Sequence, residues 1–239
     1  MLRGEEVDYT YNGRTTSTVW QQHGSGFRDI EHPIPIYVAA NGPRALRTAG
    51  MYGDGLCSVF NEQIPVLTYN LEQVRKGAQM ANRELINYQT TTLTNAVILR
   101  AGEKLTDDAI VEKAGSWAVT ALHFVYEIWR YTKEDSVVPE YMRSIWEEYC
   151  DHVDNFPLPK EKAHQLIHEG HCSFYTDGEK KFVTPEMIEG TTLVGSAAEI
   201  AEKISEAGKH GLSEVSLLPP LHNIREAAKE FAEEVIPLC

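Results

Sequence analysis

A short polar turn between an apolar strand and a helix is the part of this sequence best suited to hold a ligand. Residues 35–50 read PIYVAANGPRALRTAG. Asn41-Gly42 interrupts the apolar run, and Pro43 suits a first helical position, where the N–H that proline lacks would be unpaired anyway. Backbone N–H groups at the start of a helix attract anions. The turn is therefore predicted to cradle a phosphate, with a plain strand–helix connection as the alternative.

A group of histidines further along the chain is the main competing arrangement. His164, His168, His171 and Cys172 follow one another at spacings close to one helical turn, and zinc favours such ligands. However, Gly170 is expected to end the helix before His171, and the sequence lacks both HExxH and zinc-finger spacing. We therefore predict no metal site, and we favour a solvated or partner-facing helix for these side chains.

Other catalytic motifs are weak or missing. The adjacent carboxylates Glu147-Glu148 and Glu233-Glu234 would point apart on helices, which argues against a glycosidase pair. The sequence contains no G-x-S-x-G elbow and no P-loop, and Gly24-Ser25-Gly26 lacks the flanking strand and helix of a nucleotide fingerprint. No catalytic residue is assigned from the sequence.

Alternating strands and helices are predicted to position the turn. Four short β-rich runs each precede a helical pattern, which is typical of a parallel α/β protein. The helices are expected at about residues 39–53 and 67–85, and another begins at Ser196, where Glu199 completes a capping box. The four strands are Ile36–Ala40, Leu56–Phe60, Thr91–Leu99 and Glu214–Leu218.

The stretch between the third and fourth strands is predicted to be mainly helical. A wide apolar stripe from Ala109 to Ile128 indicates a buried helix, and we interpret the stripe as core. Further helices are expected over about residues 139–152 and 160–169. Asp177-Gly178 predicts a turn or a small hairpin. Residues 1–33 are polar and are interpreted as a lead-in loop or short hairpin.

Three segments, in order, resemble one enzyme family. The run from Pro35 to Gly55 is similar to the segment from the fifth to the sixth strand of luciferase-like flavin- and deazaflavin-dependent oxidoreductases, which are TIM barrels. LRGEEVDY at residues 2–9 resembles their lead-in to this strand. LVGSAAEI at residues 193–200 and GLSEV at residues 211–215 resemble their closing helix and last strand. The resemblance is poor between about residues 101 and 181.

The resemblance implies a cofactor, a class of reaction and a set of binding residues. The cofactor would be reduced FMN or coenzyme F-420, serving monooxygenation or hydride transfer on a small organic substrate. Residues at the ends of the second and last strands (Ser58, Phe60, Asn61 and 217–220) would line the barrel mouth. The family's phosphate-binding turn falls on Ala39, Ala40, Asn41, Gly42, Pro43 and Arg44, with most contacts from backbone N–H groups.

Composition narrows the class of protein and of partner. The chain has 239 residues and 42% hydrophobic residues, enough for one domain with a sizeable core. A formal net charge of −13 argues against a nucleic-acid partner. The sequence has no apolar run long enough to span a membrane, and residues 1–6 do not resemble a secretory signal. Four scattered cysteines are typical of reduced thiols, so a cytoplasmic location is expected.

Counting strands predicts an incomplete barrel. A TIM barrel has eight strands, so this chain would hold only strands five to eight in one partial (β/α)8 domain spanning residues 1–239. We divide that domain into a lead-in loop (1–33), strands five to seven (34–100), a helical insertion (101–183) and the last helices with strand eight (184–239). An open sheet edge invites pairing, so a homo-oligomer is expected. A catalytically silent half-barrel that acts as a subunit or ligand-binding partner is the alternative function.

Overall fold

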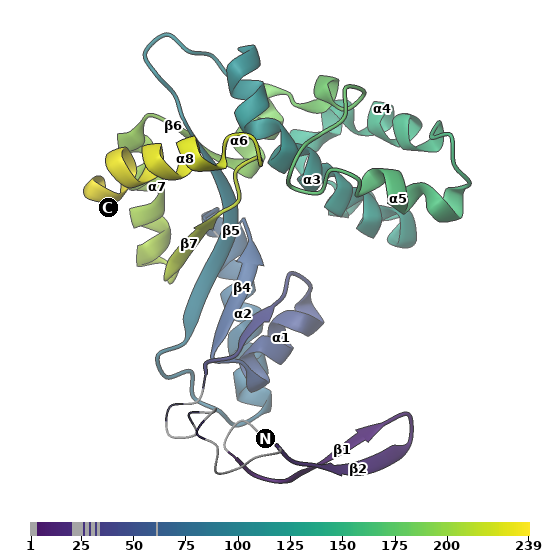
Figure 1. Ribbon diagram of the computed structural model, residues 1–239, viewed down its shortest axis with the longest axis vertical. Helices are drawn as coiled ribbons and strands as arrows, with labels where there is room; N and C mark the ends of the chain where they lie inside the picture. Colours follow the sequence, from purple (N-terminus) through teal and green to yellow (C-terminus); the bar gives the residue numbers. More distant parts are fainter. Residues whose placement is uncertain (1–3, 21–25, 27–28, 30–31, 33, 61) are drawn as a thin grey trace.

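A parallel sheet of five strands carries the predicted turn (Figure 1). The computed structural model describes residues 4–20, 26, 29, 32, 34–60 and 62–239. Helices cover the sheet, as expected for an α/β fold. The strands are β3 (Tyr37–Ala39), β4 (Gly55–Val59), β5 (Gln89–Ile98), β6 (Thr192–Gly195) and β7 (Glu214–Leu217).

Strand β5 is the central element of the sheet. Its first half pairs with β4, residues Thr91–Thr94 pair with β7, and residues Asn95–Ile98 pair with β6. Strand β3 pairs with β4 and forms one end of the sheet. Within the described residues the sheet stays open and does not close into a barrel.

Two helices hold the turn in place through an unusually close backbone contact. Helices α1 (Pro43–Tyr52) and α2 (Ile64–Met80) pack together beside β3 and β4. A Cβ atom on Gly50 would lie 1.9 Å from the carbonyl oxygen of Val74, and one on Gly77 would lie 2.0 Å from the carbonyl oxygen of Arg47. Glycine is therefore required on both sides of this contact, which sets how closely α1 and α2 approach each other.

Residues 108–191 form a helical lobe beside the sheet (Figure 1). Its longest helix, α3, ends where Lys133 adopts a left-handed conformation with φ 54°. The lobe has an apolar core of its own around the fully buried Tyr149 and Phe182. Its helices are α3 (Asp108–Thr132), α4 (Arg143–Asp154), α5 (Ala163–Ile167) and α6 (Pro185–Thr191), with 3-10 turns at Asp135–Val137, Glu140–Met142, Lys160–Lys162 and Lys180–Phe182.

The C-terminal part returns to the sheet. Helix α7 (Ala197–Lys209) begins at Ser196, and its capping box with Glu199 is present as predicted. Helix α8 (Ile224–Glu230) continues into a π-helical turn, Phe231–Val235, and a 3-10 turn, Ile236–Leu238. In the part of the chain that the structure describes, no helix is both long and apolar enough to cross a lipid bilayer.

The four predicted core strands are all present, with ends that differ by one or two residues. The prediction missed β6, so the count of four core strands was wrong. Thr192–Gly195 is a four-residue apolar segment directly between two helices, and so short a run carries no periodicity that separates strand from helix. Residues 174–183 form turns and a 3-10 helix, so the hairpin alternative there was wrong.

The N-terminal segment contains a hairpin. Strands β1 (Val7–Tyr11) and β2 (Arg14–Thr18) pair through a turn at Asn12-Gly13, where both residues have positive φ. Asn-Gly is the dipeptide that this turn favours. The interpretation of residues 1–33 as a lead-in loop alone was therefore wrong. The alternative, a short hairpin, is confirmed for residues 7–18.

Candidate functional site

The start of helix α1 lies directly after the end of β3 and offers unpaired backbone donors. Gly42 is the N-cap residue, with extended φ and ψ of −93° and 156°, and Pro43 is the first helical residue. No side chain caps this helix. The first N–H groups of α1 therefore lack the partner that a capping serine or aspartate would provide, which is a suitable arrangement for an anion.

The Asn41 side chain stabilises the turn from behind rather than capping the helix. Its Oδ1 accepts a hydrogen bond of 2.7 Å from Ser58 Oγ and one of 3.3 Å from the Val59 N–H. Asn70 Nδ2, on α2, in turn donates to Ser58 Oγ at 3.3 Å. Ser58 and Asn70 are almost fully buried. This network links the turn to β4 and α2 and leaves the helix N-terminus open.

Among the remaining residues of the predicted turn, one is buried in the sheet and the others are exposed to solvent. Ala40 is buried, and its N–H donates to the Cys57 carbonyl at 3.0 Å, which extends the β3–β4 pairing by one residue. Ala39, Gly42 and Arg44 are exposed. A Cβ atom on Gly42 would meet nothing within 4 Å. The surface that a phosphate can approach therefore consists of the backbone at Gly42 and the first turn of α1.

A small pocket of about 210 Å³ lies beside this turn, where the parallel strands end. The strand ends contribute Asn41, Phe60 and Leu218, and Leu93 lies on β5. Phe60 and Leu218 thus lie where the sequence placed the mouth, whereas Ser58 is behind it, and Asn61 lies outside the described residues. The lining is mainly apolar: Asn41, Val59, Phe60, Leu93, Trp117, Thr120, Ala121, Phe124, His171, Cys172 and Leu218.

Two residues of the pocket wall have unusual backbone conformations. Phe60 and Cys172 have φ angles of 58° and 64°, a region that bulky residues rarely occupy. The Phe60 ring lies 5.8 Å from the Trp117 ring, centre to centre, and the Cys172 N–H donates to Thr120 Oγ1 at 2.9 Å. The first contact joins the end of β4 to helix α3, and the second joins the loop after α5 to the same helix. Together they hold the strand-end wall and the α3 wall of the pocket against each other.

The sequence did not reveal the wall supplied by the helical lobe. Trp117, Ala121 and Phe124 belong to α3, whose apolar stripe was interpreted as core. Trp117 is indeed buried, and its Nε1–H donates to the Thr191 carbonyl at 2.7 Å. The periodicity of a helix identifies its apolar face but does not say whether that face meets a neighbour or a pocket.

The histidines lie close to this pocket and form no ligand set for a metal. Helix α5 ends at Ile167, so His171 is not on the helix, and it lines the pocket instead. The rings of His168 and His171 touch, with centres 5.6 Å apart. In the described parts of the chain, no three His, Cys, Asp or Glu side chains are placed to share a metal ion. The prediction that the helix ends before His171 is confirmed, and the exposed His171 side chain lines the pocket.

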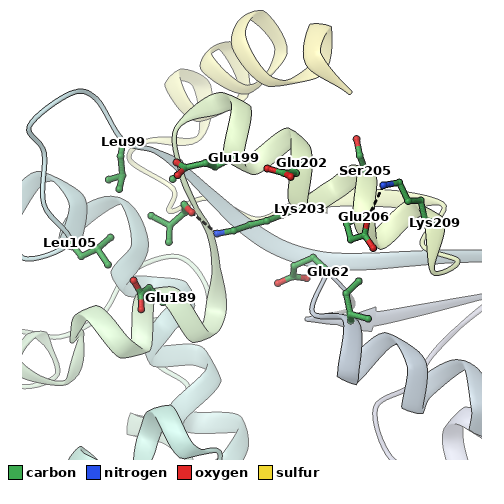
Figure 2. Close-up of a pocket in the computed structure, with 13 residues that line it drawn as sticks. Glu62, Leu99, Leu105, Glu189, Glu199, Glu202, Lys203, Ser205, Glu206 and Lys209 are labelled. Atoms are coloured by element: carbon green, nitrogen blue, oxygen red, sulfur yellow. Dashed lines mark hydrogen bonds and ion pairs between the residues drawn. The ribbon is translucent and has the colours of Figure 1, made fainter.

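A wider groove of about 700 Å³ lies between α7 and the start of α2, and Figure 2 shows that it is acidic. Its carboxylates outnumber its two lysines, and both lysines are engaged: Lys203 Nζ donates to the Val194 carbonyl, and Lys209 Nζ pairs with Glu206, each at 2.8 Å. A negative groove without a free cation among its described residues does not suit a phosphorylated cofactor. The carboxylates are Glu62, Glu189, Glu199, Glu202 and Glu206.

Glu62 at the end of this groove makes a testable contribution to stability. Thr92 and Thr94 each donate a hydroxyl hydrogen bond of 3.1 Å to its carboxylate, but burial still raises the pKa of the Glu62 carboxyl. A raised pKa in the folded state means that ionised Glu62 destabilises the fold once the pH exceeds that pKa. Glu62→Gln is therefore expected to raise Tm by about 2–4 °C at pH 8, the shift that about 1 kcal/mol produces in a chain of this size.

Thermal unfolding of Glu62→Gln at pH 8 and at pH 4 checks this expectation. The gain over the unsubstituted chain should shrink at pH 4, because the native carboxyl then carries a proton. Glu202→Gln, an exposed change in the same groove, should leave Tm unchanged at both pH values. A gain of equal size at both pH values would contradict the electrostatic explanation.

Comparisons with known proteins place these features in a family context. The model of the luciferase-like monooxygenase family matches residues 1–214. The coenzyme F-420-dependent tetrahydromethanopterin reductase from Methanopyrus kandleri is 21% identical, with a TM-score of 0.56 over 99% of this chain and 59% of that one. An F-420-dependent secondary alcohol dehydrogenase is 16% identical, with a TM-score of 0.51 over 98% and 56%.

A riboflavin lyase, solved with modified FMN and riboflavin, is 13% identical, with a TM-score of 0.50 over 98% of this chain and 48% of that one. At these identities the likeness concerns the fold alone. The chain spans less than two thirds of the length of each of these three structures.

Proposed function

The chain belongs to the luciferase-like monooxygenase family, and from that membership we propose that it serves an oxidoreductase that uses reduced FMN or coenzyme F-420. The proposed reaction is hydride transfer or monooxygenation on a small organic substrate. The turn formed by residues 39–44 would hold the cofactor phosphate, mainly through backbone N–H groups of Gly42 and the first turn of α1, and Arg44 would add a charge-assisted hydrogen bond.

The observation that carries this proposal is the open N-terminus of α1 beside an apolar pocket. The uncapped helix start fits a phosphate, and the mainly apolar lining of the neighbouring pocket fits an uncharged group. The bound cofactor would supply the redox chemistry itself. The chain's own residues would bind the phosphate, orient the ring relative to the substrate and keep the reacting atoms away from solvent.

We further propose that the sheet corresponds to the last part of an eight-stranded barrel. The solved relatives contain additional chain that this protein's match does not cover. Strands β3 and β7 each have a neighbour on one side only, in the described residues, and a parallel sheet is normally covered on both faces and closed or flanked at its edges. The missing strands would come from further polypeptide or from another subunit, and a homo-oligomer is the arrangement we favour.

Comparing the dissociation constants of FMN and riboflavin tests whether the turn binds the phosphate, independently of whether the pocket binds the ring. Riboflavin has the same ring but no phosphate, so FMN is expected to bind at least about tenfold more tightly if the turn holds the phosphate. The same comparison applies to coenzyme F-420 and its phosphate-free deazaflavin precursor. Isothermal titration calorimetry gives the dissociation constants. Equal affinities for FMN and riboflavin would show that the turn does not bind the phosphate. If none of the four ligands binds, the alternative function, a catalytically silent half-barrel, would be supported instead.

A further inference from the structure

The strand-end pocket contains one side chain suited to moving a proton. Of its described lining residues, only His171 and Cys172 have side chains of the acid–base type that commonly transfers protons in enzymes. Burial raises the pKa of the Cys172 thiol, which keeps it protonated. His171 is exposed as well as pocket-lining, so its imidazole contacts both the cavity and bulk water.

A stack of rings behind His171 holds its imidazole in place. The His168 ring packs against it at 72° to its plane, and the His123 ring packs edge-on against His168 with centres 6.0 Å apart. His123 Nε2 lies 2.7 Å from Glu179 Oε1, and both side chains are buried. Glu179 also accepts hydrogen bonds of 2.8 Å from the N–H and the hydroxyl of Thr176. The His171 ring therefore packs against His168, which in turn packs against the buried His123–Glu179 pair.

The groups around His168 favour its neutral form. Burial lowers the pKa of His168, and the facing His123 lowers it further. Glu127, whose Oε1 lies 3.7 Å from His168 Nε2, opposes this effect without reversing it, and His164 on α5 adds to the lowering. A neutral His168 does not repel a protonated neighbour, whereas a second imidazolium would.

We propose that His171 is the proton-transfer residue of the strand-end pocket and that His168 is its positioning residue. This inference rests on the proposed function and deepens it for the hydride-transfer reaction. The substrate class is a small uncharged alcohol or the corresponding carbonyl compound, because about 210 Å³ of mainly apolar space without an ionised carboxylate or amine suits such a molecule.

The proposed step is balanced for both directions of the reaction. In oxidation, a ring nitrogen of His171 would accept the hydroxyl proton of the substrate as the C–H bond breaks, and the bound flavin-type cofactor would supply the acceptor for the hydride. A C=O bond forms, and His171 returns the proton to water. In reduction, His171 donates the proton to the carbonyl oxygen as hydride arrives at the carbon.

The placement of His171 is tested without any cofactor, by NMR titration of its imidazole. Phe124 lines the same pocket from α3 and is 40% exposed, so it tolerates charged replacements. The titration of His171 is expected to move to lower pH in Phe124→Lys and to higher pH in Phe124→Glu, each by about half a pH unit. Tyr131→Lys, on the same helix and 77% exposed, is the matched control and should have no effect. Absence of opposite shifts in the two Phe124 variants would overturn the placement.

Steady-state kinetics with the cofactor that binds test the role itself. His171→Gln is expected to lower kcat at least about hundredfold, without changing the cofactor dissociation constant, and to remove one limb of the pH–rate profile. His168→Gln should lower kcat by about tenfold and retain that limb, as a positioning residue would. His210 is the exposed C-cap residue of α7 and does not line the pocket, so His210→Gln should match the unsubstituted chain.

The outcomes distinguish this inference from the proposed function. Unchanged kcat in His171→Gln, with normal cofactor binding, overturns the inference and leaves the proposed function intact. Failure of the unsubstituted chain to bind FMN or coenzyme F-420 overturns the proposed function, even where the NMR titrations confirm that His171 faces the pocket. A shared loss of kcat and of the pH limb in His168→Gln would assign the proton transfer to His168 instead.

Discussion

Gly50→Ala is expected to lower the free energy of unfolding by about 3 kcal/mol or more, at the upper end of overpacking effects. The added Cβ would lie 1.9 Å from the Val74 carbonyl oxygen, and a backbone atom within a helix cannot rotate away. Helices α1 and α2 would have to separate, which also displaces the turn that begins α1. Urea unfolding followed by circular dichroism measures the loss.

A second glycine provides the control for this experiment. Gly208, near the end of α7, has nothing within 4 Å of its ideal Cβ position. Gly208→Ala is therefore expected to stabilise the chain by about 0.5 kcal/mol, since alanine loses less backbone entropy in a helix. An equal, small effect at both positions would mean that α1 and α2 are not in the close contact described.

Gly42→Val is expected to weaken FMN binding at least tenfold while leaving riboflavin binding unchanged. The new side chain meets nothing within the protein, so the fold is retained, but its two methyl groups would occupy space that an approaching phosphate needs. The dissociation constants of both ligands, measured by calorimetry, give the ratio directly. Coenzyme F-420 and its phosphate-free precursor provide the same ratio for the deazaflavin case.

The control for Gly42→Val introduces the same residue further along the helix. Thr48 is exposed one turn beyond the site, and Thr48→Val should leave both affinities unchanged. Arg44→Gln should reduce FMN affinity by only a few-fold, because an exposed side chain adds little to a site built from backbone groups. Retention of full FMN affinity in Gly42→Val would show that no phosphate lies against this turn.

The local signals in the sequence were sufficient for four of the five strands of the sheet and for the strand–helix turn. Short β-rich runs identified β3, β4, β5 and β7, and the Ser196 capping box identified the start of α7. These features depend on residues adjacent in the sequence, so their chemistry can be read directly. The cofactor role of residues 39–44 stays a prediction, but their position at a strand end, with an uncapped helix behind them, agrees with it.

The pocket could not be predicted because it depends on contacts between distant segments. Nothing near Trp117 in the sequence indicates that it meets Phe60, which precedes it by more than fifty residues. His171 illustrates the same difficulty: the sequence predicted that the helix ends before it, but not that it lines the pocket. The short strand β6 was missed because its pairing with β5, rather than its own composition, defines it.

Strand β5 has a consequence for how the two walls of the pocket come apart. Its first half belongs to the ladder with β4 and β7, its second half pairs with β6, and the chain then continues to α3, which supplies the opposite wall. One uninterrupted strand therefore joins three ladders and leads into the helix of the opposite wall. Separation of the sheet at β5 would break these ladders together, so the amide hydrogens of β5 should exchange with solvent only when the whole molecule unfolds cooperatively.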